Sequence, residues 1–503
     1  FARSVPAPPP FTLSSSSPRR SRPMMRTDEP SGLSQPLRPQ RDRSAYRNFL
    51  KMAVLFSINH GTVAAVLNIS VQLLGDAGSY QSGALYITYA LTALMFSSAL
   101  NEALGPRWSL VVAAGLYSLY VLSLPLALML PPEARGARVA LALCGGTVGG
   151  FAAGFLWAAQ GTYFALSARR HALQMDIEPA EANAELASAF ASTFLSLELC
   201  LKALPIGLLP LSHKMVHVLG HDVSSSNLLI GALYSLLALS AAAGLTRVSD
   251  LSDAAKPEDA EAPRDTSAAA AAAAADDAAA AANRTTTVAV PSRFFSRIGA
   301  VCELWARRPV VLLLAPTQAA FGVSAALLGY EVTGKLVKQA FGADAVLAGS
   351  LCSALVSAVA ALLQPVSRAA AKRVGRPAVL LAALLSFAAL AALVLATSDG
   401  LAAPAFVTVL PFYLLQGAGR AGYEGINKAL YADTFGPTDS PAAFSNIVLA
   451  NGAASAVAYF TFPSLGRHAM AYAAGTCAAV AIVGYIAAEV AIQRTPGGRG
   501  HPA

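Results

Sequence analysis

Twelve apolar stretches, each long enough to cross a lipid bilayer, limit how this chain can fold. A transmembrane helix needs about 20 apolar residues, because each residue rises ~1.5 Å and the hydrocarbon core is ~30 Å thick. Stretches of that length lie near residues 49–73, 83–104, 108–130, 138–166, 187–212, 227–246, 309–331, 345–366, 377–397, 403–427, 442–464 and 469–492. Turn or charge signals bound them. The sequence therefore predicts an all-α integral membrane protein of about twelve transmembrane helices.

Composition supports the same class. The chain has 503 residues, of which 55% are hydrophobic and only 13% charged, whereas soluble domains carry about 25% charged residues. Most of the surface must therefore contact the lipid bilayer. The cysteines occur singly, without the spacing of a metal site, so we expect them to act as small packing residues. They are Cys144, Cys200, Cys302, Cys352 and Cys477.

The basic residues indicate how the helices are oriented. The net charge of +8 resides in the N-terminal tail and in short loops between apolar stretches, so we expect no nucleic-acid partner. With a cytosolic N-terminus, the inner loops hold Arg107, Arg169, Arg170, Arg368, Lys372, Arg373, Arg376 and Lys428. The outer loops then hold Arg135, Arg138, Lys214, Lys335, Lys338 and Arg467. On the inner side, the first helix is also flanked by Arg38, Arg41, Arg43, Arg47 and Lys51. This bias predicts that both termini are cytosolic; it does not distinguish a plasma membrane from an endomembrane or a plastid membrane.

Two segments lack the composition of a packed helix. Residues 1–45 are rich in Pro, Ser and Arg, which predicts a disordered cytosolic tail or a targeting segment. Residues 249–292 pass from Asp, Glu and Pro into an alanine tract, which predicts a disordered linker. The expected domains are six-helix bundles at 46–248 and 293–494, followed by a cytosolic tail at 495–503.

An internal repeat indicates that the two bundles are related. Short basic hairpins around one glycine occur at Leu100–Arg107 and at Ala371–Pro377, about 270 positions apart. A Gln-Gly step occurs at Gln160 and again at Gln416, a separation of 256 positions. Similar spacing at two points predicts a duplicated six-helix unit, with any solute pathway between the halves.

The first hairpin resembles the loop signature G-x-x-x-D-x-x-G-R-R of the major facilitator superfamily. Glu102 stands at its acidic position, Gly105 at the inner glycine and Arg107 at the final basic position, while Ser98 replaces the leading glycine. The resemblance implies the major facilitator fold, two pseudo-symmetric six-helix bundles.

Longer motifs resemble one branch of that superfamily. The runs at 104–110, 154–163, 420–428 and 442–446 are similar to the Unc-ninety-three-like branch, and the pattern Trp-x-x-Gln-Gly-x-Tyr that begins at Trp157 is the most distinctive. Members of that branch are described as regulatory subunits of potassium channels, as trafficking chaperones of receptors and as transporters. Fold alone does not choose among these functions.

Polar residues inside the apolar stretches are candidates for a central cavity. Glu198 and Lys202 lie one helical turn apart, so they can pair on one face, and a charge at the bilayer centre costs ~2.5 to 3.5 kcal/mol. A polar stripe on the first helix and uncharged groups on later helices complete the set, which is His60, Asn68, Gln72, Gln160, Gln318, Gln416 and Asn451. The alternative is structural: a locking ion pair, a satisfied core histidine and amides that hold helices together.

A second set predicts a cytosolic gate. Arg420, Glu424 and Lys428 repeat every four residues and therefore share one helix face. The two basic hairpins should lie nearby and would add Glu102, Arg107, Lys372, Arg373 and Arg376. The alternative for this cluster is an anchor at the membrane interface.

Motifs of enzymes are missing from the sequence. We find no P-loop, nucleophile elbow, HExxH or dinucleotide-binding fingerprint, so we expect neither an enzyme nor a cofactor or metal. Two functions remain open. One is a secondary transporter of a small solute or ion, and the other is a non-transporting regulator of a membrane partner, either a channel or a receptor.

Overall fold

The computed structural model describes residues 43–208, 215–251, 290–397, 405–435 and 439–494. Within these ranges the chain is helical apart from one small hairpin of strands, β1 (Met215–Val218) and β2 (His221–Ser224). The predicted N-terminal tail and linker fall almost wholly outside the described residues, and the predicted C-terminal tail falls outside them completely.

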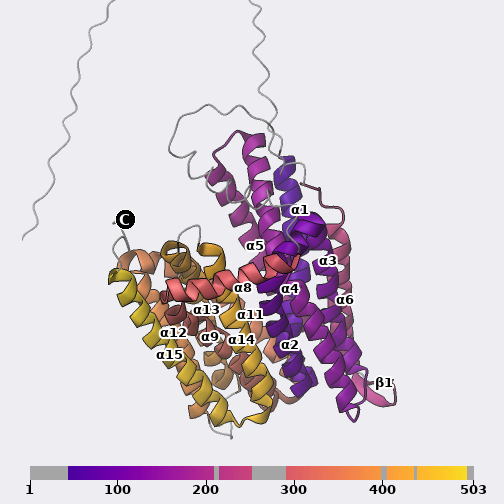
Figure 1. Cartoon of the computed structure of the whole chain (residues 1–503). Helices are drawn as coiled ribbons and strands as arrows, with labels where there is room; N and C mark the ends of the chain where they lie inside the picture. The colour runs from indigo at the N-terminus through magenta and orange to yellow at the C-terminus, as the bar shows by residue number, and fades with distance from the viewer. Residues whose placement is uncertain (1–42, 209–214, 252–289, 398–404, 436–438, 495–503) are drawn as a thin grey trace, which may run out of the picture. The chain divides into compact units, whose positions relative to one another are not determined.

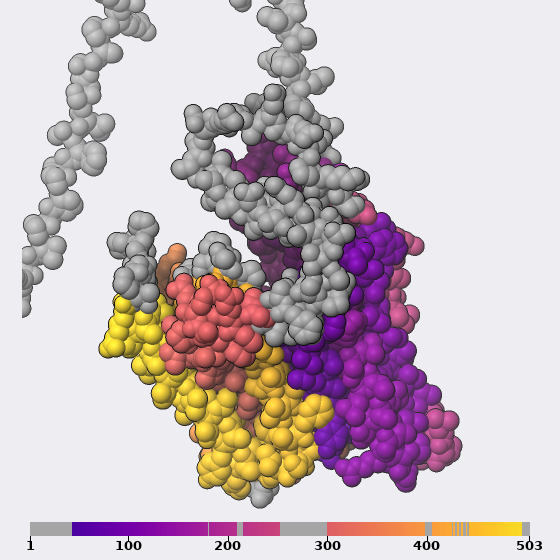
Figure 2. Space-filling model, in the orientation of Figure 1, coloured from indigo at the N-terminus to yellow at the C-terminus, as the bar shows by residue number. Residues whose placement is uncertain are grey.

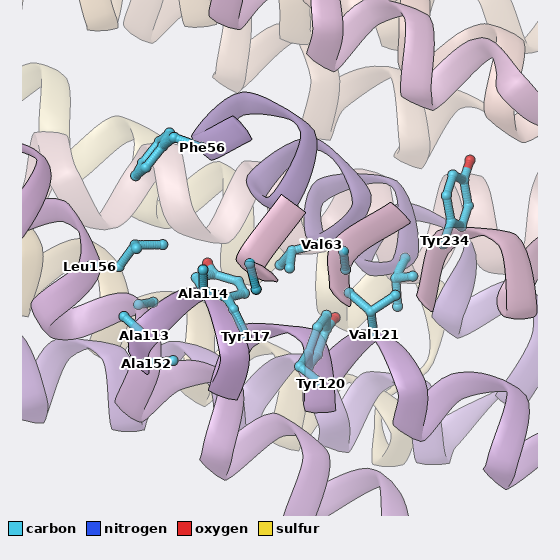
Figure 3. Packing of buried hydrophobic residues seen from close by; sticks show 14 of the residues in the cluster. Phe56, Val63, Ala113, Ala114, Tyr117, Tyr120, Val121, Ala152, Leu156 and Tyr234 are labelled. Carbon is cyan, nitrogen blue, oxygen red and sulfur yellow. The ribbon is translucent and has the colours of Figure 1, made fainter. Parts of the chain in front are cut away.

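The first half of the chain forms one helical bundle (Figure 1). Its helices are α1 (Ser44–Leu74), α2 (Asp76–Met95), α3 (Ser97–Leu128), α4 (Arg135–Met175), α5 (Pro179–Leu208) and α6 (Ser225–Leu245). Buried aromatic and aliphatic side chains fill its centre. Figure 3 shows Val63 of α1 near Tyr117 and Tyr120 of α3, with Phe56 of α1 and Tyr234 of α6 on either side.

The second half forms another bundle. Its elements are α8 (Val290–Arg307), α9 (Val310–Leu327), the π-helix η3 (Leu328–Leu336), α10 (Val337–Phe341), the short turn η4 (Gly342–Asp344), α11 (Ala345–Val374), α12 (Arg376–Ala396), α13 (Ala405–Thr434), α14 (Ser440–Thr461), the short turn η5 (Phe462–Ser464) and α15 (Arg467–Arg494). The residues of α9, η3 and α10 form one continuous helical segment. The bundles contact each other mainly through α2 with α14 and α5 with α11.

The number of spans agrees with the sequence. Nine helical segments of the described chain are long and apolar enough to cross a membrane. One of them, Val310–Val374, contains two spans, because the chain turns at Gly342, where φ is 53°. The more polar helices α2 and α13 complete twelve. The predicted fold class is therefore confirmed: an all-α membrane protein of two six-helix bundles.

Several boundaries differ from those predicted. The second span begins at Asp76 instead of near residue 83, because Gly75 alone makes the turn and its carbonyl accepts from the amides of Gly78 and Ser79. Helix α4 continues to Met175 instead of ending near residue 166. At ~1.5 Å per residue its 41 residues extend well beyond the hydrocarbon core.

Helix α8 was not predicted as an element. It precedes the first membrane-spanning helix of the second half, and it contacts α2 of the first half and α14 of the second. The Trp305 indole donates to the Asn446 side chain (2.6 Å), and Arg307 and Arg308 both lie within ion-pair distance of Asp439. Figure 2 shows α8 on the surface of this face of the molecule. Its apolar residues recur every three to four positions, a signal that the neighbouring alanine tract obscured.

The two predicted hairpins have the same backbone conformation. Gly105 has φ 75° and ψ 161°, and Gly375 has φ 88° and ψ 151°. This region is essentially restricted to glycine. The glycine in each hairpin is therefore required by the turn, and the agreement supports the internal repeat. Gly105 and Gly375 lie at the same end of the two bundles, which we call the terminal end. Gly75 and Gly342 lie at the opposite end, which we call the far end.

Replacing Gly375 by alanine is expected to lower the free energy of unfolding by about 1 to 3 kcal/mol, because a Cβ is strained at this φ and ψ. Gly115→Ala is the matched control, since a Cβ there meets open space inside α3 and alanine favours helix. Thermal unfolding in detergent should separate the two variants. Equal stability of both would contradict the strained turn.

Candidate functional site at the seam between the halves

A buried ion pair lies on α5 where the two halves meet. The Lys202 ammonium donates to Glu198 Oε1 at 2.6 Å. Glu198 is 3% exposed and Lys202 is 7% exposed. The spacing of four residues places both on one face of α5, as the sequence predicted. Because a charge inside the membrane is costly, each group needs the other.

The second half contributes two further groups to this pair. Ser357 of α11 accepts from the Lys202 ammonium (2.9 Å) and donates to Glu198 Oε1 (3.1 Å). Arg420 of α13 donates to the same oxygen at 3.4 Å. Ser357 and Arg420 both lie near the middle of their 30-residue helices. The pair on α5 is therefore the centre of a network that joins both halves.

Arg420 also pairs with Glu424 on its own helix, at 2.9 Å. The network formed by Glu198, Lys202, Ser357, Arg420 and Glu424, here called the seam network, thus contains two positive and two negative side chains. Their formal charges cancel, which is the condition for keeping several charges in an apolar interior. The sequence assigned Glu198 to a cavity and Arg420 to a gate, whereas the structure brings them together.

An aromatic cluster surrounds His60 next to the seam network. The His60 ring lies 5.2 Å from Phe194 of α5 and 5.0 Å from Trp157 of α4, measured between ring centroids. Phe56 and Tyr117 complete the surround at 6.2 and 6.0 Å. The Nδ1 atom of His60 is buried and has no hydrogen-bond partner among the described residues.

The other predicted cavity residues do not form one site. Gln318 lies within the second half, where it bonds with Thr317, Asn427, Tyr423 and Tyr431.

The remaining amides are spread along the bundle, although Asn68 lines a small cavity that Lys202 also lines. Asn68 bonds to the carbonyl of Ala64 in its own helix, and Asn451 accepts from Ser455. Gln416 is buried with its oxygen unpaired among the described groups, and Gln160 is half-buried. The hydrogen bonds of Asn68 and Asn451 stay within their own helices, so these two bonds do not join helices.

The predicted gate residues are also divided. Arg107 donates to the carbonyl of Thr246 and lies over the Trp108 ring. The side chains of the basic hairpins at the terminal end are mostly exposed; these are Glu102, Lys372, Arg373 and Arg376. Lys372 and Arg373 form no ion pair with the described part of the chain. The side chain of Lys428 lies outside the described residues.

Contacts at the far end join the halves and were not predicted as a group. Gln72 of α1 donates to the carbonyl of Ala345 in α11 (3.1 Å). Ser79 of α2 donates to the carbonyl of Tyr459 in α14 (2.6 Å). The third contact runs from the Tyr330 hydroxyl of η3 to Asp76 (3.0 Å). These three contacts, here called the far-end contacts, close the seam at that end.

A second buried acid lies close to the far-end contacts. Glu331 of η3 is 1% exposed and pairs with Arg467 (2.7 Å) and Lys335 (3.3 Å). Its Glu-Lys spacing of four residues is the same signal that identified Glu198. Across the described ranges, no three His, Cys, Asp or Glu side chains lie close enough to hold a metal ion.

Comparisons with solved structures identify the fold. A variant of the nucleoside transporter NupG has a TM-score of 0.60 at 10% identity, covering 88% of this chain and 100% of its own. A D-xylose-proton symporter reaches 0.59 at 15% identity, covering 92% and 100%. The inward-open xylose transporter XylE from E. coli reaches 0.57 at 12% identity, covering 89% and 95%. At such low identity these matches establish the major facilitator fold alone.

Comparison with family sequences is more specific. No curated relative matches the chain. The family described as "Ion channel regulatory protein UNC-93" matches residues 72–178. That region includes the first basic hairpin and the pattern that begins at Trp157. The resemblance inferred from the sequence is therefore confirmed: residues 72–178 match the UNC-93 family, and the chain has the major facilitator fold.

Proposed function

We infer that this protein is a secondary transporter, not an enzyme, that moves a small solute or ion by alternating access. The observation that carries this proposal is the seam network, in which charges from both halves meet at mid-depth. A scaffold that never moves gains little from such charges, because apolar residues of similar volume stabilise a seam at least as well. Ion pairs between two rigid bundles can instead break and form again as the bundles move.

The positions of the contacts between the halves support the same proposal. The far-end contacts close one end of the seam, while α4 and α13 pack mainly within their own halves. With the terminal end placed in the cytosol, as the basic residues suggest, this arrangement corresponds to an inward-facing state.

Reciprocal motion of the two ends tests the proposal without knowledge of the solute. In a background without native cysteines, Ser79→Cys reports on the far end, because Ser79 is fully buried. Asp76→Asn weakens the contact with Tyr330, and it should increase labelling of this cysteine by an impermeant maleimide several-fold. Spin labels at Leu173 and Val374, which are exposed in α4 and α11, should move closer together in the same variant.

Loosening that is only local would increase the labelling and leave the distance between the spin labels unchanged. That outcome would contradict alternating access. Leu219→Cys, exposed in the far-end hairpin, is the labelling control and should react equally in both backgrounds.

A second candidate function is regulation of an ion channel. It is favoured by the description of the family that matches residues 72–178. A regulator should purify with a membrane partner, such as a potassium channel, in fixed stoichiometry. It should also show no change in the spin-label distance when the far-end contacts are weakened.

A further inference from the structure

Three donors converge on one carboxylate oxygen at the centre of the seam network. Glu198 Oε1 accepts from Lys202 at 2.6 Å, from Ser357 at 3.1 Å and from Arg420 at 3.4 Å. Two of these donors are cationic, and the three come from both halves. Such a set of charge-assisted donors can bind a side-chain carboxylate such as that of Glu198, and it can equally bind a free small oxyanion.

We propose that the seam network is a binding site for a small monovalent oxyanion, such as a short carboxylate, and that the Glu198 carboxylate occupies this site until the solute replaces it. The proposal rests on the transporter function and names its class of solute. The charges of the seam network indicate that the solute carries a single negative charge. With Glu198 displaced or neutralised, Lys202 and Arg420 face only Glu424, which leaves a net charge of +1.

A small cavity next to Lys202 supplies the second observation. It is lined by Asn68, Lys202, Tyr234, Ser350 and Ser353, together with apolar residues of α1. Ser350 is 2% exposed, and its buried hydroxyl has no hydrogen-bond partner among the described residues. A buried hydroxyl without a partner is costly, and an oxyanion held by Lys202 could accept its hydrogen bond. The space is too narrow for a water molecule in this conformation, so a solute can enter the site only as the Glu198 carboxylate leaves it.

The arrangement also couples the solute to the seam. An anion bound at Lys202, Ser357 and Arg420 would bridge the two halves as Glu198 does now. Replacement of Glu198 by the anion therefore keeps the seam together, but the link between α5 and α13 is then a solute that can dissociate instead of a side chain of α5. In the empty state the Glu198 carboxylate occupies the site, and in the loaded state the carboxylate of the solute takes its place.

Binding of radiolabelled acetate to the purified full chain in a scintillation proximity assay tests the site. The wild-type protein should bind acetate saturably, with competition by unlabelled acetate but not by acetamide or methylammonium. Glu198→Gln removes the competing carboxylate and retains the side-chain volume, so it should tighten acetate binding at least tenfold. Ser357→Ala, a mild change, should weaken binding severalfold.

Glu331→Gln is the matched control, because it removes another buried carboxylate that pairs with two cations and lies outside the seam network. It should leave acetate binding unchanged. Equal competition by acetamide, or equal affinity of the wild-type and Glu198→Gln proteins, would overturn the oxyanion site. Acetate binding without reciprocal motion of the two ends would retain the site and reject transport. Reciprocal motion without acetate binding would reject the site and retain transport.

Discussion

Replacing Lys202 by methionine is expected to lower the free energy of unfolding by about 3 kcal/mol. The substitution keeps an unbranched side chain as far as the Cε position and removes the ammonium group, so Glu198 remains buried with only Arg420 and Ser357 as donors. Breaking a buried ion pair from one side costs ~3 to 5 kcal/mol, and the remaining Arg420 contact places the expected loss at the lower end. Reversible denaturation in mixed micelles provides the measurement.

The double variant Glu198→Gln with Lys202→Met distinguishes a pair from two separate effects. It removes both charges, so it should be more stable than Lys202→Met alone. Lys335→Met is the matched control. It breaks another Glu-Lys pair with the same spacing, but Lys335 is 41% exposed and Glu331 keeps Arg467, so its loss should stay below about 1 kcal/mol. A double variant as unstable as the sum of its single variants would show that Glu198 and Lys202 act independently.

The parts of the fold that could be predicted are those encoded locally. Span length depends only on a run of apolar residues, so the helices were identified even where their ends were misplaced. The turns at Gly105 and Gly375 were found because glycine is needed for one backbone conformation. The pairing of Glu198 with Lys202 was found because four residues make one turn of a helix.

The contacts between the halves could not be predicted in the same way. Ser357 is one of several serines in apolar stretches, and nothing in its neighbourhood distinguishes it. Arg420 was recognised as a charged residue, but its contact with Glu198 spans 222 positions, and local spacing carries no information about such a distance. Asp76 has the sequence context of a turn residue, whereas the structure uses its carboxylate to hold the far end.

The polar stripe of the first helix shows the limit of an argument from one helix face. His60, Asn68 and Gln72 do share a face, as their spacing requires. A helix of 31 residues passes several neighbours along its length, so each of the three meets a different environment. His60 lies among aromatic rings, Asn68 returns to its own backbone, and Gln72 reaches α11. Spacing identified the face correctly, but the neighbours decide the role of each residue.

Replacing Gly150 by alanine is expected to destabilise the first bundle by about 3 kcal/mol, at the upper limit for overpacking. A Cβ at this position would overlap the carbonyl oxygen of Leu85 and the hydroxyl of Thr88, and it would lie 2.8 Å from the amide of Tyr89. Two of these three atoms belong to the backbone of α2, so rotation of one side chain cannot make room. The whole of α2 would have to move away from α4.

Gly161→Ala tests the same substitution in the same helix, where a Cβ meets open space. Its stability should equal or exceed that of the wild-type protein, because alanine is the better helix former. Thermal unfolding of both variants in detergent gives the comparison. If Gly150→Ala were as stable as Gly161→Ala, the close approach of α2 and α4 would not depend on glycine. Because α2 also carries Ser79 and Asp76, a displaced α2 should in addition loosen the far-end contacts, and Ser79→Cys labelling in the Gly150→Ala background would detect this.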